Sequence, residues 1–339
     1  MKKGITKILS ACVFAFVVFL AAGTQSKAAV NMGVKQTGAG SSYVDLAWNA
    51  QLGAGHYHTQ FSQDGKNWID MEYSSSPSDS VYNLTQGASY YARVVAYNGS
   101  HYSGTHVMVG VSETAIVSTK PTEVTGLTQT AAGVNSVSMS WNASAGAASY
   151  VIYGYINYNW TQIGTSATNS ATITGVAATT STKFSVAAVK NVTGGTVTGD
   201  QCSGVEMKAI PIKVSRIAMQ YYWDSLKEAK YIWTDVNNAD GYQYEVKSAN
   251  GKKTYFRATS TSSYTYVKPF PRGIFVKARV RAYVTVGNKV YYGAWSPYTY
   301  HASSKKVTAK RSSNGKKIYL KWKKVSGASG YQVYVSTKS

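Results

Sequence analysis

The sequence predicts an all-β protein made of β-sandwiches in series, preceded by a signal peptide. One observation is composition: 28 tyrosines and 30 glycines occur in 339 residues, while only 14% of the residues are charged. Tyrosine, threonine and valine suit the half-exposed, pleated surface of a strand, so helical bundles are disfavoured. The other observation is repetition, because one pattern recurs four times. Three complete sandwiches and a truncated fourth are therefore expected.

The first 28 residues have the features of an export signal. Lys2, Lys3 and Lys7 give a positive start, residues 8–22 are an apolar run, and Ala28 is a small residue suited to cleavage. An uncleaved anchor is the alternative, but this run is shorter than the roughly 20 residues that a membrane-spanning helix needs. We therefore expect a secreted or cell-wall-associated protein with no membrane span after cleavage.

Each copy of the repeat pairs a tryptophan on one strand with a tyrosine nine residues later, at the start of the next strand. Apolar and polar residues alternate around each tryptophan, which indicates a sheet with one buried face. Repeats of this length, with short strands and frequent turns, favour a sandwich over a propeller blade or a solenoid coil. The four pairs are Trp48 and Tyr57, Trp141 and Tyr150, Trp233 and Tyr242, and Trp322 and Tyr331.

Two short motifs predict hairpin turns after the tyrosine strands. Asp64-Gly65 precedes Trp68 in the first copy, and Asn250-Gly251 precedes Tyr255 in the third. Both dipeptides favour the tight turns that join neighbouring antiparallel strands.

With these residues the chain resembles the fibronectin type III family over nearly everything after the signal. Leu84 and Tyr90 have the six-residue spacing of the family's tyrosine corner, and residues 293–297 (Gly-Ala-Trp-Ser-Pro) are similar to its final strand. The corner tyrosine is replaced by Thr182 in the second copy and by Val276 in the third. The resemblance implies two-sheet sandwiches, with those two corners fixed by other contacts.

The expected boundaries follow the repeat: a signal at 1–28, sandwiches at 29–118, 119–209 and 210–303, and a partial sandwich at 304–339. The last range holds about three strands of sequence, too few to close a sandwich. Either the chain is a fragment of a longer protein, which we favour, or this tail pairs elsewhere.

Positive charge is concentrated after about residue 210. The four ranges contain 3, 4, 14 and 10 basic residues against 6, 3, 5 and 0 acidic ones, for net charges of −3, +1, +9 and +10. This asymmetry suggests a polyanionic partner, although basic side chains can also serve solubility alone. We favour an anionic cell-wall polymer or glycan. Surface proteins are a further partner class, and no nucleic acid is expected because no nucleic-acid motif is present. The favoured contact residues are Lys305, Lys306, Lys310, Arg311, Lys316 and Lys317.

Four of the five histidines lie in the first range. Tyr57 should face the core, so His56 and His58 should share the outward face of their strand, and the resemblance places His101 and His106 in the same sheet. Imidazoles arranged in this way could bind zinc or nickel. Since no carboxylate or cysteine is placed to complete the set, we expect exposed imidazoles, no metal, no cofactor and no zinc dependence of stability.

Outward aromatic side chains are the other candidate ligand surface. Tyr91 and Tyr97 are expected to face outward beside the histidine pair, where flat rings could stack on sugars. The alternative is cross-strand aromatic pairing that only stabilises the sheet. In the third range, Arg279 and Arg281 are expected to stack on Trp295. Further aromatic candidates there are Tyr221, Tyr222, Trp223, Tyr291 and Tyr292.

The sequence disfavours an enzyme. It has 14 acidic residues and 5 histidines, and it lacks the serine-hydrolase, zinc-protease and phosphate-loop motifs. Cys202 is the only cysteine of the mature chain, and we expect it to behave as a small buried hydrophobe. Two hypotheses remain. The chain is a non-catalytic extracellular spacer or adhesive array on or near a bacterial surface, or it carries accessory modules of a glycan-degrading enzyme whose catalytic domain lies outside it.

Overall fold

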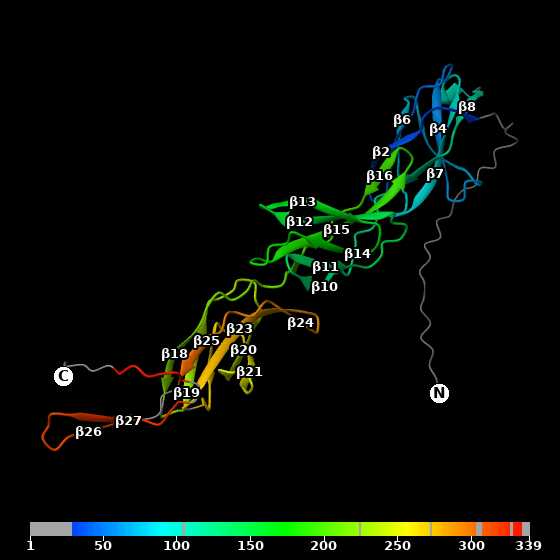
Figure 1. Ribbon diagram of the computed structural model, residues 1–339. Coiled ribbons are helices and arrows are strands. Elements are labelled where there is room, and N and C mark those ends of the chain that lie inside the picture. The colour runs from blue at the N-terminus through cyan, green and yellow to red at the C-terminus, as the bar shows by residue number, and fades with distance from the viewer. Residues whose placement is uncertain are drawn as a thin grey trace, which may run out of the picture. The chain divides into compact units, whose positions relative to one another are not determined.

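A computed structural model describes residues 29–333, except 104–105, 224, 272, 303–306 and 326–327. The predicted signal peptide therefore lies outside the described residues, as do Lys305 and Lys306. The described part of the chain consists of strands β1 to β27 and one 3-10 turn, η1 (His101–Ser103) (Figure 1). None of its elements is a helix long and apolar enough to cross a membrane. The prediction of an all-β protein built of tandem sandwiches is confirmed.

The first sandwich pairs a three-stranded sheet, in the order β2-β3-β6, with a larger sheet in the order β1-β8-β7-β4-β5, in which β9 also pairs with β7. Its core holds Val44, Leu46, Trp48, Tyr57 and Phe61, all less than a tenth exposed. The strands are β1 (Ala29–Val30), β2 (Lys35–Ala39), β3 (Val44–Ala47), β4 (His56–Ser62), β5 (Ile69–Ser74), β6 (Ser78–Val81), β7 (Ser89–Tyr97), β8 (Met108–Ser112) and β9 (Ala115–Ser118).

The second sandwich repeats this arrangement, with sheets in the orders β10-β11-β14 and β13-β12-β15-β16, and with β17 on β15. Its buried residues include Val137, Met139, Trp141, Ile152 and Phe184. The strands are β10 (Thr128–Gly133), β11 (Ser136–Ser140), β12 (Ser149–Ile156), β13 (Asn159–Ser166), β14 (Ser170–Thr174), β15 (Thr182–Val192), β16 (Gly195–Thr198) and β17 (Val205–Met207).

The third sandwich has sheets in the orders β18-β19-β22 and β21-β20-β23-β24, with β25 on β23. Tyr231, Trp233, Val246 and Val280 belong to its core. The strands are β18 (Ile217–Trp223), β19 (Glu228–Trp233), β20 (Gly241–Ser248), β21 (Thr254–Ser260), β22 (Tyr264–Val267), β23 (Phe275–Val286), β24 (Lys289–Tyr292) and β25 (Thr299–Ala302).

The tryptophan-tyrosine pair has the same geometry in all four copies. The ring centres lie 5.2–5.4 Å apart in edge-on contacts, which is a favourable arrangement for aromatic rings. Each tyrosine hydroxyl also accepts a hydrogen bond from the backbone N–H six residues earlier, at 2.6–3.0 Å. The nine-residue spacing is thus explained by one contact that links the two sheets of each sandwich.

The fourth copy is a hairpin of β26 (Thr308–Arg311) and β27 (Ile318–Lys321) followed by the Trp322 and Tyr331 pair. Val325 is 4% exposed, but Ile318 is 65% and Leu320 is 38% exposed. The equivalent residues of the first copy, Val44 and Leu46, are buried. The hairpin therefore presents apolar as well as basic side chains.

The tyrosine corner and both hairpin turns occur where they were predicted. The Tyr90 hydroxyl accepts a hydrogen bond from the Thr85 N–H at 3.0 Å. Gly65 and Gly251 adopt φ values of 73° and 77°, a conformation that costs glycine little. By its contacts the chain divides into two compact units, one of residues up to 122 with 145–148 and 189–200, and the other of the remaining residues.

Candidate functional site

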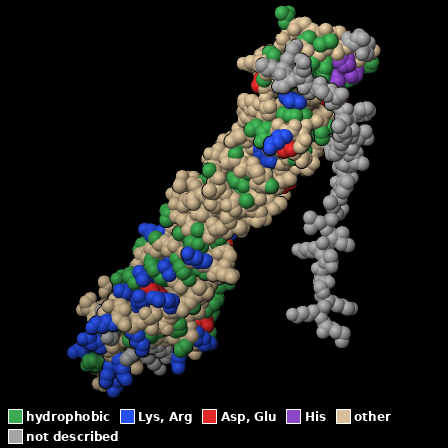
Figure 2. All heavy atoms as spheres, turned by 90° about the vertical axis from the view of Figure 1, so that its right-hand side faces the viewer, with side chains coloured by type: hydrophobic (Ala, Val, Ile, Leu, Met, Phe, Trp, Pro, Cys, Tyr) green, Lys and Arg blue, Asp and Glu red, His purple; other side chains and the backbone are tan. Residues whose placement is uncertain are grey.

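Three groups of side chains on the described surface carry recognisable chemistry: basic residues of the third and fourth copies, an aromatic plate on the third sandwich, and an imidazole cluster on the first sandwich. On the face shown in Figure 2, lysine and arginine side chains gather over the third sandwich and the hairpin, while the histidines lie on the first sandwich.

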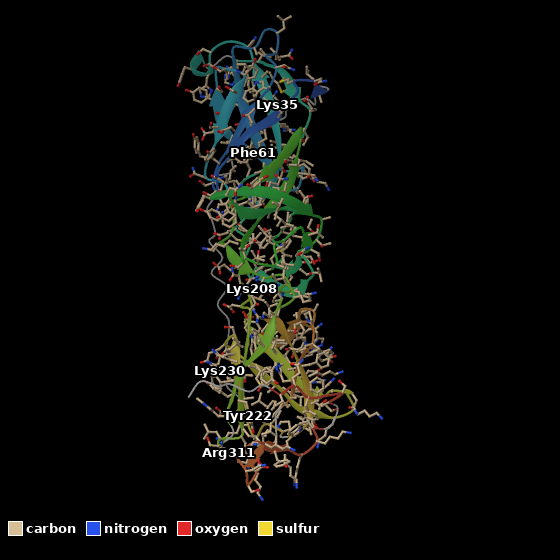
Figure 3. All side chains as sticks on the ribbon, turned by 60° about the vertical axis from the view of Figure 1, so that its left-hand side comes forward. Lys35, Phe61, Lys208, Tyr222, Lys230 and Arg311 are labelled. Atoms are coloured by element: carbon tan, nitrogen blue, oxygen red, sulfur yellow. The ribbon has the colours of Figure 1, made fainter. Side chains whose placement is uncertain are left out.

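The β26-β27 hairpin displays four of the six predicted contact residues. Lys310 and Arg311 lie on β26, Lys316 and Lys317 lie beside its turn, and all four are exposed. No acidic residue occurs after position 303, so their positive charge is not neutralised within this copy. Arg311 is labelled in Figure 3.

Three basic side chains of the third sandwich form ion pairs with one buried carboxylate. The Glu245 side chain on β20 is fully buried and forms ion pairs with Arg257 Nη2 at 2.6 Å, Arg279 Nε at 2.6 Å and Lys247 Nζ at 3.0 Å. Burial alone would raise the pKa of Glu245, but hydrogen bonds from the three cations lower it to about 2. These three cations therefore fix the sheet as well as contributing charge.

Arginine and aromatic side chains alternate next to this ion-pair cluster. Arg279 lies over Trp295 at 4.3 Å and Tyr298 at 4.8 Å, and Arg281 lies over Tyr292 at 3.8 Å and Trp295 at 4.4 Å. The predicted stacking of both arginines on Trp295 is confirmed. The cation-π contacts hold both guanidinium groups against these aromatic rings.

Four aromatic side chains, Tyr221, Trp223, Tyr264 and Tyr266, form what we call the aromatic plate on the outer face of the β18-β19-β22 sheet. The Tyr221 and Trp223 ring centres are 4.5 Å apart, and those of Tyr264 and Tyr266 are 5.9 Å apart. Trp223, Tyr264 and Tyr266 are 44–48% exposed. A hydrogen bond to Tyr266 raises the pKa of Tyr221 to about 12, so the Tyr221 hydroxyl stays uncharged at neutral pH.

Lys230, labelled in Figure 3, contacts the plate, with Nζ 5.0–5.8 Å from the centres of the Tyr221, Tyr264 and Tyr266 rings. The expectation that Tyr222 joins this surface is wrong: its ring packs inward against Phe270, with centres 5.6 Å apart, because neighbours on a strand face opposite sides. Sequence reasoning missed Tyr264 and Tyr266. Their alternation around Thr265 was the signal that could have revealed them.

The imidazole cluster comprises His56 and His58 on β4, His101 in η1, and His106 before β8. The ring centre of His56 lies 5.4 Å from those of His58 and His101 and 5.2 Å from that of His106, and the centres of His58 and His101 lie 5.2 Å apart. The expectation that all four histidines lie in one sheet holds only for His56 and His58. His101 and His106 lie in the connection between β7 and β8, where their rings reach that of His56. The expected exposure is wrong for His56, which is 2% exposed, because the other imidazoles and Tyr97 lie around its ring.

Burial affects the charge state of His58. It lowers the pKa of His58, Asp70 partly opposes this effect, and the neighbouring histidines add to it. His58 is therefore mainly neutral at pH 7, with a lone pair on one ring nitrogen.

Tyr97 and Tyr91 lie at opposite ends of the same strand pair. Tyr97 stacks on His56, with centres 5.3 Å apart and planes 12° apart. Tyr91 pairs instead with Ser62 at the other end of β4, roughly 20 Å away at the rise of an extended strand. The expectation that Tyr91 lies beside the histidines is therefore wrong, although its side chain is 39% exposed.

Cys202 is a free, buried cysteine, in agreement with the expectation of a small buried side chain. Its sulfur lies 3.3 Å from the Val186 N–H. A thiol in this position packs as part of the second sandwich.

No family model matches this sequence. A stretch of 162 residues is 33% identical to chitinase A1 of Niallia circulans, covering 45% of this chain and 22% of that protein. The chain thus spans less than a quarter of the length of this curated relative. Among solved structures, the chicken CNTN1 FN1-FN3 domains align over 81% of this chain and 98% of that one, with 15% identity and a TM-score of 0.33.

Proposed function

We propose that this chain is a non-catalytic extracellular array, a spacer or adhesive module at a bacterial surface, and that its basic third and fourth copies bind an anionic wall polymer. The observation that carries the proposal is the segregation of charge, with +9 and +10 on the last two ranges and −3 and +1 on the first two. A concentrated positive field attracts a polyanion and orients it toward this part of the chain.

Exposure supports the hairpin as the main contact. Lys310, Arg311, Lys316 and Lys317 are exposed on it, whereas Arg257, Arg279 and Lys247 of the third sandwich are engaged with Glu245. Flexible, exposed lysines can follow the irregular spacing of charges along a polymer. The contact is then mainly electrostatic and requires no shaped pocket.

A salt titration of polymer binding tests the proposal. Residues 29–339 are expected to bind purified teichoic acid, with heparin as a second anionic probe, at 0.1 M salt and to lose binding at 1 M, since the screening length falls from about 10 Å to about 3 Å. Replacing Lys310, Lys316 and Lys317 with glutamine should weaken binding about tenfold, from three exposed contacts of about 0.5 kcal/mol each.

The matched control removes the same charge elsewhere: Lys35, Lys66 and Lys183, all exposed, are replaced with glutamine. This variant should bind almost as wild type does. Equal weakening by the two triple variants, or binding that ignores salt, would show that the charge serves solubility only.

A second candidate function is supported by the aromatic plate and by the likeness to a protein named chitinase A1. Here the chain is an accessory module of a glycan-degrading enzyme, and Trp223 and Tyr264 stack on sugar rings. Chitin binding should then persist at 1 M salt and fall at least about tenfold in Trp223→Ala, since truncating an anchoring aromatic commonly costs more than 1 kcal/mol. Tyr158→Ala is the control, because Tyr158 is 90% exposed and lies in the second sandwich. Retained binding in Trp223→Ala would exclude the plate.

A further inference from the structure

We propose that His56, His58 and His101 of the first sandwich form a binding site for a divalent late transition metal, with Zn²⁺ as the test ion. One ring nitrogen of each of these residues lies within 4.8 Å of one ring nitrogen of each of the other two. Imidazole is a common ligand of Zn²⁺, Cu²⁺ and Ni²⁺. The inference is independent of polymer binding, because it concerns a different sandwich and different residues.

The hydrogen bond made by one ring nitrogen of His56 fixes its tautomer. Its Nδ1 lies 3.0 Å from the carbonyl oxygen of Gly99, and a carbonyl can only accept, so Nδ1 carries the proton and donates it. In the neutral ring, Nε2 is then a bare lone pair. That atom is buried and has no hydrogen-bond partner among the described residues.

A buried lone pair without a partner is unfavourable, because its lost hydration is not replaced. A bound cation would replace it. Metal-ligating histidines characteristically donate their other ring N–H to a carbonyl or carboxylate, which fixes the tautomer and the ring orientation. His56 already makes that contact through Gly99.

His58 and His101 are close enough to bind the same metal ion. His58 Nε2 and His101 Nδ1 share a hydrogen bond at 3.2 Å, so one of them carries a proton that must leave this nitrogen when a metal ion binds. With Zn–N bonds of about 2.0–2.1 Å, two ligand nitrogens of a tetrahedral site are separated by about 3.4 Å. These two atoms are therefore already spaced as a shared metal ion requires, and the third nitrogen must approach by no more than about 1.5 Å to complete the set.

The surrounding rings hold the ligands in place. Tyr73 stacks on His101, with centres 4.2 Å apart and planes 5° apart, and Tyr97 stacks on His56. Stacked partners restrict ring rotation and so reduce the entropy lost when a metal binds. His106, 5.2 Å from His56 by ring centres, or a water molecule supplies the fourth ligand.

This proposal reverses the expectation of no metal that came from the sequence. That expectation rested on the lack of a cysteine or carboxylate beside the histidines. The donor set is instead formed by three imidazoles, a number that suffices for a zinc site with an open fourth position.

The test is a titration of untagged residues 29–339 with ZnCl₂ in phosphate-free buffer, followed by isothermal calorimetry. One ion per chain is expected to bind, and the melting temperature of the first sandwich should rise by several degrees and fall again on adding EDTA. Co²⁺ should give the visible absorption of a tetrahedral nitrogen site. No saturable binding up to about 0.1 mM Zn²⁺ overturns the proposal, since zinc sites bind far more tightly.

Two variants and a control locate the site. His58→Ala and His101→Ala should each weaken Zn²⁺ binding by about 100-fold, a loss of one ligand being at least as severe as the loss of an outer-shell partner. His301→Ala, outside the cluster, should bind as wild type does. Equal weakening in all three variants contradicts the assignment. If a variant fails to fold, the wild-type titration and its Co²⁺ spectrum still decide the question.

Discussion

Replacing Trp141 with alanine is expected to unfold the second sandwich at moderate temperature while the first and third remain folded. Trp141 is 3% exposed, and its ring meets that of Tyr150 at 5.2 Å. Truncating a buried tryptophan costs about 3–5 kcal/mol, a large part of the roughly 5–15 kcal/mol that stabilises a domain. Without a disulfide, packing is the main source of stability for this sandwich.

Hydrogen exchange of the full chain measures this effect sandwich by sandwich. Amides of β11 and β12 should exchange through global opening in Trp141→Ala and remain protected in wild type. Trp160→Ala is the matched control, because Trp160 lies on β13 of the same sandwich and is 38% exposed. Protection of β11 that survives Trp141→Ala would refute the role of this residue in the core.

Replacing Glu245 with glutamine is expected to destabilise the third sandwich by about 2–3 kcal/mol, because a buried carboxylate loses its charge-assisted hydrogen bonds to cations that are themselves partly exposed. The substitution leaves Arg257, Arg279 and Lys247 close together without their shared carboxylate. Urea denaturation of the full chain, followed by hydrogen exchange in β20 and β23, measures the loss.

The same residue predicts how stability depends on pH. The pKa of Glu245 is lowered from 4.5 to about 2 in the folded chain, so its contribution is complete above about pH 4.5 and is lost as the pH falls from there to about 2. The shift corresponds to about 3 kcal/mol. Glu245→Gln should lack this acid-dependent loss, whereas Glu228→Gln, on β19 of the same sandwich, should keep it. An unchanged acid transition in Glu245→Gln would show that other carboxylates control it.

The positions of the histidines in the imidazole cluster were predicted only in part from the sequence. Alternation around Tyr57 correctly placed His56 and His58 on one face of β4, because side-chain direction along a strand is a local property. The alternation did not indicate that His56 is buried, or that the Gly99 carbonyl oxygen accepts a hydrogen bond from His56 Nδ1. Both depend on the path of the chain between β7 and β8, which follows no sequence periodicity.

The positive charge of the third and fourth copies was likewise predicted only in part. Counting residues was enough to locate the positive charge, but no local pattern indicates that Glu245 pairs with three of the cations. Arg257 and Arg279 are 12 and 34 positions away from it, and only the pairing of β20 with both β21 and β23 brings them together.

The sequence by itself determined the fold class, the repeat and the tryptophan-tyrosine pair of each copy, because period-2 alternation is a property of a single strand and the nine-residue spacing joins strands that are consecutive in the chain. Only the tertiary structure decided that Nε2 of His56 is buried with no hydrogen-bond partner among the described residues, that Tyr264 and Tyr266 join Tyr221 and Trp223, and that Glu245 lies among three cations. The physical reason is that burial and electrostatic pairing depend on which strands become neighbours in space. Residues far apart in the chain acquire their chemistry only when the sheets bring them together.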